Sequence, residues 1–260
     1  MTSWAECARG EAISIPPVHT RSLLKIENPS PEKARIHLEY VDDDNVKTID
    51  QTVSIKINTF CFTKDMITRL KNKVGGQNTS YEIICAHIWR HTTKAREHLH
   101  GKKVGFISIV NMRERVDPPL GKAYFGNAFM WTIATATSVE LEEEDLASTA
   151  ERIHRSLISC TNETFQNWLH WLELYDRDAM FECCSLNNAR TRASSSHNFP
   201  VFKVDFGWGK PLAARLPSAG DLGKIIFFLG KDIPGNIDAV LALPTHVMNR
   251  LESDKAFTNP

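Results

Sequence analysis

The 260-residue sequence predicts an α/β fold in which mixed β-sheets are flanked by helices. Short apolar or alternating segments, typical of strands, are separated by longer segments with helical periodicity. The hydrophobic and charged fractions, 42% and 24%, are those of a soluble globular protein. The length allows one large core or two small ones.

Charge and cysteine content argue against several classes of protein. The formal net charge is zero and basic residues are not concentrated in one segment, so nucleic acid is not expected as the main partner. No apolar run reaches the roughly 18 residues of a membrane span, and the pattern of a signal peptide is absent. The six cysteines include no Cys-x-x-Cys pair, which argues against a disulfide framework and favours a reducing, cytoplasmic compartment.

The first part of the chain contains one helical segment and two connecting segments. Residues Trp4–Gly10 are typical of the last turns of a helix that ends at a glycine. Ile13–Leu24 contains two adjacent prolines and is expected to be extended. Glu32–Thr52 is charged and aperiodic, which predicts a linker. The alternation of Val53–Ile57 then predicts a strand.

Two helices follow, each with a capping signal. Thr63 is predicted to cap a helix that ends at the glycine pair 75–76. Thr79 and Glu82 have the spacing of a capping box and predict the start of a second helix. Apolar side chains at helical spacing are expected to face the core: Ile67, Leu70, Val74, Tyr81, Ile84, Cys85, Ile88 and Trp89.

His87 and His91 stand four residues apart on the second helix, a spacing at which two imidazoles can share a zinc ion. The segment between them lacks the glutamate of a His-Glu-x-x-His motif, and no third ligand is evident. We therefore predict no metal site and expect hydrogen bonding on the helix surface or between helices.

The remaining elements are assigned in the same way. Strands are predicted over 104–110, 126–134, 225–229 and 237–243, the last two joined by a hairpin-like connection. Amphipathic helices are predicted around 146–157 and 165–172, the second capped by Asn162, and a short C-terminal helix is predicted to be capped by Thr245. Residues 181–197 are polar and without clear periodicity.

The segment Val204–Pro211 combines an acid, two aromatic residues, two glycines and a proline. Glycines at alternate positions allow positive φ, and the proline favours an extended Lys210. A carboxylate among aromatic side chains needs a partner, because an unpaired buried charge costs several kcal/mol. Since Phe199–Val204 has the apolar pattern of a strand, the sequence predicts a strand that runs into a rigid bend, which holds Asp205 and seats Trp208.

Four blocks resemble the BAHD acyltransferases, plant enzymes that move acyl groups from coenzyme A thioesters to alcohols or amines. The sequence Asp-Phe-Gly-Trp-Gly-Lys-Pro is similar to the C-terminal signature of that family, which is thought to hold the architecture rather than take part in the reaction. The first block resembles the segment that follows the family's catalytic His-x-x-x-Asp-Gly motif. In chain order the matching residues are Trp4, Ala8, Arg9, Gly10, Pro16, Pro17, Arg21, Leu23 and Leu24, then the helix 80–96, the block 113–127 and the signature 205–211.

The resemblance implies a two-lobe architecture like that of chloramphenicol acetyltransferase, of which this chain supplies mainly the C-terminal lobe. The implied division is 1–19 as the tail of an N-terminal lobe, 20–52 as a crossover linker, 53–186 and 211–260 as the C-terminal lobe, and 187–210 as a strand and signature motif that return to the N-terminal lobe.

The family's general base is not found, because none of the ten histidines is followed by aspartate four positions later. The resemblance therefore implies an acyl-CoA-dependent acyltransferase of hydroxycinnamoyl type, represented by a truncated chain that is inactive alone. It implies acyl-CoA as co-substrate, a small hydroxyl or amine acceptor, no permanently bound cofactor and a monomeric full-length form. The alternative is a non-catalytic paralogue that binds acyl-CoA or a full-length relative.

The resemblance also suggests site residues. Arg113 is expected to pair with Asp205, with Arg115 as the second choice, because a planar guanidinium holds a carboxylate at two points; two solvated loop arginines are the alternative. Lys71 and Lys73 are candidates for contacts with coenzyme phosphates, or else solvated lysines at a helix end. The signature residues with a structural role are Asp205, Phe206, Gly207, Trp208 and Gly209.

The acceptor side of the site is less defined. Ser194 falls on the threonine of a family Thr-Ser-Trp triplet and is the candidate oxyanion or acceptor contact. The tryptophan of that triplet falls on Ser196, and an arginine for the acceptor carboxylate falls on Phe181. Arg190 or Arg192 would replace that arginine only if the loop is shifted, so shikimate is one candidate acceptor among several.

Overall fold

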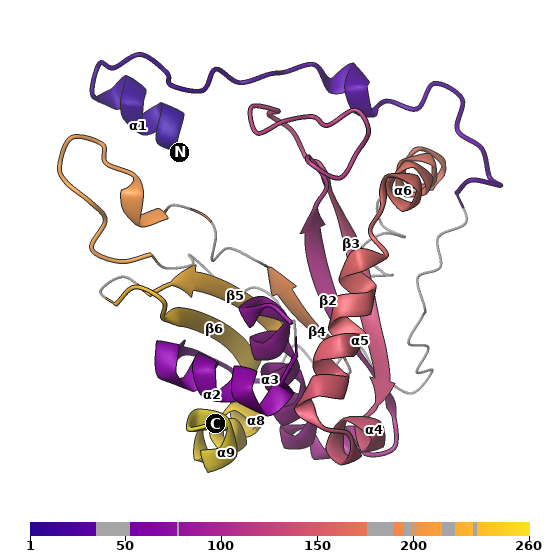
Figure 1. The fold of residues 1–260 in the computed structure, drawn as a ribbon, viewed down its shortest axis with the longest axis vertical. Coiled ribbons are helices and arrows are strands. Elements are labelled where there is room, and N and C mark those ends of the chain that lie inside the picture. The colour runs from indigo at the N-terminus through magenta and orange to yellow at the C-terminus, as the bar shows by residue number, and fades with distance from the viewer. Residues whose placement is uncertain are drawn as a thin grey trace.

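The computed structural model describes residues 1–34, 53–76, 78–175, 190–194, 199, 201–214, 222–230 and 233–260 (Figure 1). Its strands are β1 (Ile55–Phe62), β2 (Lys103–Asn111), β3 (Phe129–Thr137), β4 (Arg190–Ser194), β5 (Lys224–Leu229) and β6 (Ile237–Pro244). Its α-helices are α1 (Thr2–Ala8), α2 (Lys64–Val74), α3 (Ser80–Ala95), α4 (Ser138–Glu143), α5 (Leu146–Ile158), α6 (Asn162–Leu174), α8 (Thr245–Ser253) and α9 (Lys255–Thr258). Short 3-10 helices are Arg21–Leu24, Glu97–Leu99 and Val201–Lys203.

The described strands form one mixed sheet in the order β1-β6-β5-β4-β2-β3. β4 lies at the centre and runs parallel to both of its neighbours, β2 and β5, whereas the other pairs are antiparallel. The predicted hairpin between β5 and β6 is confirmed, with Leu229 opposite Ile237. A mixed sheet with flanking helices is the predicted fold class.

Two apolar clusters hold the helices against this sheet. The larger cluster joins α2, α3, α5, α8 and α9 to the sheet and includes the fully buried Trp89 and Phe106. The smaller cluster packs Phe165 and Trp168 of α6 against Trp131 of β3. Figure 1 shows α2, α3 and α8 gathered beside the lower part of the sheet and α5 beside β3. Burial of these side chains supplies most of the driving force for folding.

The predicted helix caps at Thr63 and Thr79 are confirmed. The Thr63 side chain accepts a hydrogen bond from the N–H of Met66, and Gly75 ends α2 in the left-handed region at φ 64°. Thr79 and Glu82 form the reciprocal hydrogen bonds of a capping box at the start of α3. These elements begin and end where local side-chain chemistry requires.

Two other predicted caps are wrong. The cap of α6 is Thr161 rather than Asn162, because the Thr161 side chain accepts from the N–H of Thr164 while Asn162 accepts from the N–H of Asp117. Thr245 does not cap α8; its hydroxyl donates to the carbonyl oxygen of Ser54. In both cases a tertiary partner changes the role that the local pattern indicates.

One strand is missed and another is misplaced. β4, with the sequence Arg-Thr-Arg-Ala-Ser, lies in the stretch interpreted as aperiodic and polar, yet Thr191 and Ala193 are almost completely buried. The strand predicted over Phe199–Val204 is wrong: Val201–Lys203 is a 3-10 helix, and no described strand pairs with it. An extended segment without a neighbouring strand leaves its backbone groups unpaired, which disfavours a strand.

The N-terminal segment runs along the top of the molecule in Figure 1 and contacts the loop between β2 and β3. Val18 forms an isolated parallel bridge with Tyr124: its N–H donates to the Ala123 carbonyl at 2.8 Å and its carbonyl accepts from Phe125 at 2.8 Å. This bridge attaches the connector to the body of the fold. The expectation of an extended segment over 13–24 is wrong for its last four residues, because Arg21–Leu24 is a 3-10 helix.

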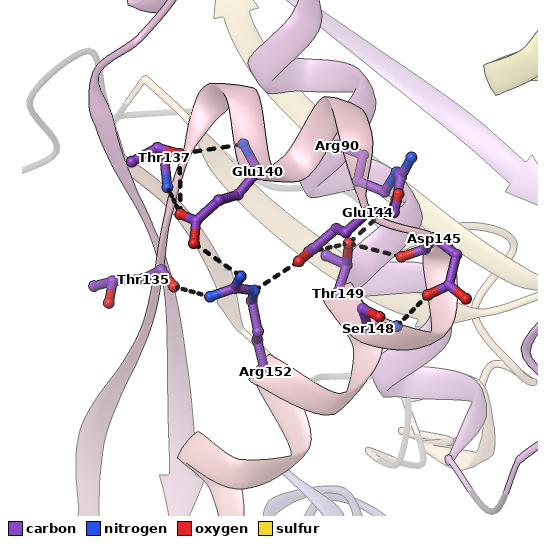
Figure 2. Close-up of polar contacts among 9 residues, drawn as sticks. All are labelled: Arg90, Thr135, Thr137, Glu140, Glu144, Asp145, Ser148, Thr149 and Arg152. Atoms are coloured by element: carbon purple, nitrogen blue, oxygen red, sulfur yellow. Dashed lines mark hydrogen bonds and ion pairs between the residues drawn. The ribbon is translucent and has the colours of Figure 1, made fainter.

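A network of charged side chains braces the corner where β3 ends and α4 and α5 begin (Figure 2). Arg152 of α5 donates to Glu144 at 2.9 Å, to Glu140 at 3.2 Å and to the carbonyl oxygen of Thr135 at 3.3 Å. One guanidinium therefore ties two helices to the end of the edge strand β3. The loop between α4 and α5 is further held by Arg90, which donates to the Glu144 carbonyl.

Candidate functional site

The signature bend, residues Asp205–Pro211, folds around the carboxylate of Asp205. Its Oδ1 atom accepts from the backbone N–H of Gly207 at 2.7 Å and of Gly209 at 2.9 Å. Both glycines have positive φ, 105° and 97°, a conformation that L side chains rarely adopt. These hydrogen bonds hold the pKa of Asp205 below its ordinary value, and the bond from Gly207 has the larger effect.

The aromatic residues of the bend lie on its outside. The Phe206 and Trp208 rings stack with centroids 6.5 Å apart, and Trp4 of α1 meets Phe206 edge to face at 5.2 Å. Trp208 is 93% exposed, so the expectation that the bend seats this indole is wrong for the described residues. The physical reason is that Trp4 of α1 packs on Phe206, whereas the Trp208 indole stacks on Phe206 and stays exposed to solvent.

The predicted pair between Arg113 and Asp205 is not formed. Arg113 donates to Asn111 Oδ1 at 3.0 Å, to the Tyr124 carbonyl at 3.3 Å and to the Gly126 carbonyl at 2.6 Å. The guanidinium of Arg113 therefore donates its hydrogen bonds within its own loop. The Asp205 carboxylate accepts its hydrogen bonds within the signature bend. Arg113 therefore supports the loop on which Val18 docks.

Arg115, the second choice, is also engaged elsewhere. Its Nη1 atom donates to the carbonyl oxygens of Leu157 and Cys160, at 2.7 and 3.1 Å, and so closes the end of α5. The guanidinium that reaches the signature bend is Arg9, which donates to the carbonyl oxygen of Asp205 across 196 positions of sequence. Arg9 is part of the family-like Ala-Arg-Gly pattern, but no local signal indicated its partner.

The candidate acceptor and coenzyme residues lie on separate elements. Ser194 is the last residue of β4, half-buried and paired in register with Ile226 of β5. Lys71 and Lys73 are exposed in the last turn of α2, next to Gly75. No hydrogen bond in the described part of the chain connects Ser194 to either lysine. The Phe181 and Ser196 positions lie outside the described residues, whereas Arg190 and Arg192 are part of β4.

The two histidines of α3 each bind a residue near the C-terminus. Nδ1 of His91 lies 2.7 Å from Oδ2 of Asp254, and Nε2 of His87 lies 3.1 Å from the Phe257 carbonyl oxygen. Burial, reinforced by the neighbouring His91, lowers the pKa of His87 to about 3. The expected interhelical hydrogen bonding is confirmed. Among the described residues no group of three or more histidine, cysteine or acidic side chains could hold a metal ion.

No helix in the described ranges is long and apolar enough to cross a membrane.

Two solved structures are representative of those with the same fold. Vinorine synthase superposes with a TM-score of 0.71 at 21% identity, over 96% of this chain and 55% of that one. F. sporotrichioides TRI101, in complex with coenzyme A and T-2, superposes with a TM-score of 0.76 at 22% identity, over 98% of this chain and 60% of that one. These similarities confirm the predicted fold class.

Sequence comparison adds close relatives and a family. The chain is 30% identical over 233 residues to a hydroxycinnamoyltransferase of Narcissus pseudonarcissus and 29% identical over 231 residues to the shikimate O-hydroxycinnamoyltransferase of Nicotiana tabacum. Each match covers 82% of this chain and 52% of the relative, so the chain spans about half the length of these relatives. The Transferase family matches residues 1–258, and the chain therefore belongs to this family, that of the BAHD acyltransferases.

Proposed function

We propose that this chain forms the coenzyme-facing part of an acyltransferase that moves an acyl group, of hydroxycinnamoyl type, from a coenzyme A thioester to a small alcohol or amine. The observation that carries the proposal is the family match over residues 1–258, which includes the formed signature bend. The proposed enzyme is cytoplasmic and, at full length, monomeric. The four cysteines of the described residues, all free, fit a reducing compartment.

Acyl transfer from a thioester needs a base for the acceptor proton and donors for the oxyanion of the tetrahedral intermediate. The acceptor oxygen or nitrogen bonds to the thioester carbonyl carbon, and the carbon–sulfur bond then breaks to release coenzyme A. The Ser194 hydroxyl, at the carboxyl end of a central parallel strand, is the proposed oxyanion or acceptor contact. No histidine of these 260 residues has the His-x-x-x-Asp context, and loss of a general base costs roughly 10²–10⁴-fold. We therefore expect negligible turnover from this chain alone.

The proposed coenzyme contact is the C-terminal turn of α2. Lys71 and Lys73 place two exposed positive charges beside the left-handed Gly75, where the backbone leaves the helix. Lysine binds phosphate as a point charge, so the affinity for a polyanion such as coenzyme A should depend on both side chains and on salt.

Calorimetric titration of the chain with coenzyme A tests this contact. The unmodified chain should bind, and the double charge reversal Lys71→Glu/Lys73→Glu should weaken binding by about tenfold or more, which corresponds to about 1.4 kcal/mol. The matched control is Lys25→Glu/Lys33→Glu, which reverses two exposed lysines in the N-terminal segment. An equal loss of coenzyme A affinity in both variants would reflect net charge alone. It would contradict the assignment of Lys71 and Lys73 to the coenzyme site.

The alternative function is a non-catalytic paralogue that binds acyl-CoA or a full-length relative. The specific observations behind it are that no histidine of these 260 residues has the His-x-x-x-Asp context, and that apolar side chains are exposed near the signature bend, Phe199, Trp208 and Leu212. A polypeptide extended upstream to the length of the relatives distinguishes the two. Release of coenzyme A from hydroxycinnamoyl-CoA in the presence of an acceptor supports the enzyme, whereas binding without release supports the paralogue.

A further inference from the structure

We infer that Arg9 is a positioning residue that clasps helix α1 to the signature bend. Its guanidinium bridges two groups: Nη1 donates to the Asp205 carbonyl oxygen, while Nε donates to Glu11 Oε1 at 2.8 Å and Nη2 to Glu11 Oε2. Glu11 thus binds the Nε–Nη2 edge of the guanidinium at two points, and Nη1 donates to the bend. This is the long-range link that sequence reasoning assigned to Arg113.

An aromatic contact supports the same junction from the other end of α1. The Trp4 ring meets Phe206 at 5.2 Å and an interplanar angle of 85°, the edge-to-face arrangement that aromatic pairs favour. A Cβ atom at Gly207 would lie 3.7 Å from Cγ of Arg9, so the arginine stem also packs against the bend. Trp4 and Arg9 lie near opposite ends of α1 and both contact consecutive residues of the signature.

The turn that carries Arg9 is itself closed. Glu6 accepts from the Ser14 hydroxyl at 2.6 Å and from the Ser14 N–H at 3.0 Å, and the N–H of Glu11 donates to the Glu6 carbonyl at 2.9 Å. Residues 6–14 therefore form a closed loop, which holds Arg9 and Glu11 on one side. The arginine is presented to the bend by a preorganised element rather than by a free chain end.

The chemistry requires arginine at this position. A planar guanidinium can bind a carboxylate through one edge and donate to a carbonyl through another, whereas a lysine ammonium offers one compact centre. We expect Arg9→Lys to keep the positive charge near Asp205 but to lose one of the two partners. The consequence for catalysis rests on the proposed function: α1 resembles the segment that follows the family's catalytic motif, so the clasp would fix that segment relative to the signature bend.

Hydrogen–deuterium exchange of the 260-residue chain tests the clasp directly. The peptides to follow are 2–14, with the turn amides, and 204–212, with the Gly207 and Gly209 amides bonded to Asp205. Arg9→Ala should accelerate exchange in both peptides by about tenfold, the factor expected for losing one hydrogen bond to a charged group. Trp4→Ala, which alters a largely exposed side chain, should accelerate both peptides to a smaller extent.

The matched control is Arg155→Ala, which removes an exposed arginine paired with Glu151 on α5 and should leave both peptides unchanged. Faster exchange of residues 2–14 alone in Arg9→Ala would overturn the clasp. It would also be overturned if both peptides of the unmodified chain exchanged as fast as those of Arg9→Ala.

A titration of Asp205 distinguishes the electrostatic effect of the Arg9 guanidinium from the packing of α1 against the bend. By carboxyl NMR, the pKa of Asp205 should rise in Arg9→Ala, because a nearby positive charge is removed, and stay low in Arg9→Lys and Trp4→Ala. An unchanged Asp205 pKa in Arg9→Ala would contradict the placement of the guanidinium.

The catalytic consequence has its own readout. In the upstream-extended polypeptide, Arg9→Ala should lower kcat by about tenfold or more and leave KM for acyl-CoA within about twofold, because the clasp positions a segment rather than binding substrate. An unchanged kcat would overturn this consequence. An inactive extended polypeptide would instead refute the proposed function, and the exchange and titration results would still decide the clasp.

Discussion

Nε2 of His87 lies 3.1 Å from the carbonyl oxygen of Phe257, and this hydrogen bond joins the middle of α3 to the C-terminal helix α9. The imidazole also stacks on the Phe257 ring, with centroids 5.3 Å apart and planes 10° apart. A carbonyl oxygen only accepts, so Nε2 carries the proton of a neutral ring. Burial disfavours a second proton and lowers the pKa of His87 to about 3.

Stability should therefore fall as the pH is lowered below about 6.5. The folded-state pKa of His87, about 3, lies below the unfolded value near 6.5, so the unfolded chain binds the proton more tightly. The contribution of the neutral imidazole to the free energy of unfolding is fully present above about pH 6.5 and is lost as the pH approaches 3. The loss amounts to about 2 kcal/mol at pH 5. His87→Gln should flatten the pH dependence of urea unfolding between pH 7 and 5. The control His246→Gln, at an exposed position of α8, should keep it; identical slopes in all three proteins would contradict the linkage.

Removing the cap of α3 should destabilise the fold without changing the core. Thr79→Ala deletes the oxygen that accepts from the N–H of Glu82 and should cost about 1 kcal/mol. Thr68→Ala is the matched control, because Thr68 is exposed within α2 and its replacement favours the helix slightly. Urea unfolding midpoints measure both. A Thr79→Ala midpoint equal to that of Thr68→Ala would show that the cap contributes nothing.

Two arginines of α5 provide a comparison of a network with an isolated pair. Arg152→Ala removes contacts to Glu140, Glu144 and Thr135 (Figure 2) and should cost about 1–2 kcal/mol after allowance for its partial exposure. Arg155→Ala removes one exposed pair with Glu151 and should cost about 0.3–0.5 kcal/mol. Thermal unfolding distinguishes these values, and equal losses would mean that the network adds nothing beyond a single pair.

Arg113 should act on its own loop and not on the signature bend. Arg113→Lys cannot reach Asn111, Tyr124 and Gly126 together, so the Phe125 amide, which donates to Val18, should exchange faster. Asp205→Asn should leave that amide unchanged. Faster exchange of the Phe125 amide in Asp205→Asn would restore the ion pair expected from the resemblance.

Local chemistry made much of the architecture predictable. The caps at Thr63 and Thr79, the left-handed Gly75 and the apolar strands β2, β5 and β6 depend on residues close in sequence, and the structure has them where the patterns indicate. β4 could not be recognised in this way, because its polar sequence becomes a buried central strand only when β2 and β5 lie on both sides of it.

The candidate site divides in the same manner. The order of glycines, aromatic residues and acid in the signature bend determined by itself that the backbone turns back on Asp205, since the partners are two and four residues away. Only the tertiary structure decided which guanidinium contacts this bend. Arg9 lies 196 positions away from Asp205, and no sequence pattern indicates which acceptor a distant arginine will bind. Arg113 was an equally good donor in chemical terms, but the carbonyl oxygens of its own loop satisfy it first.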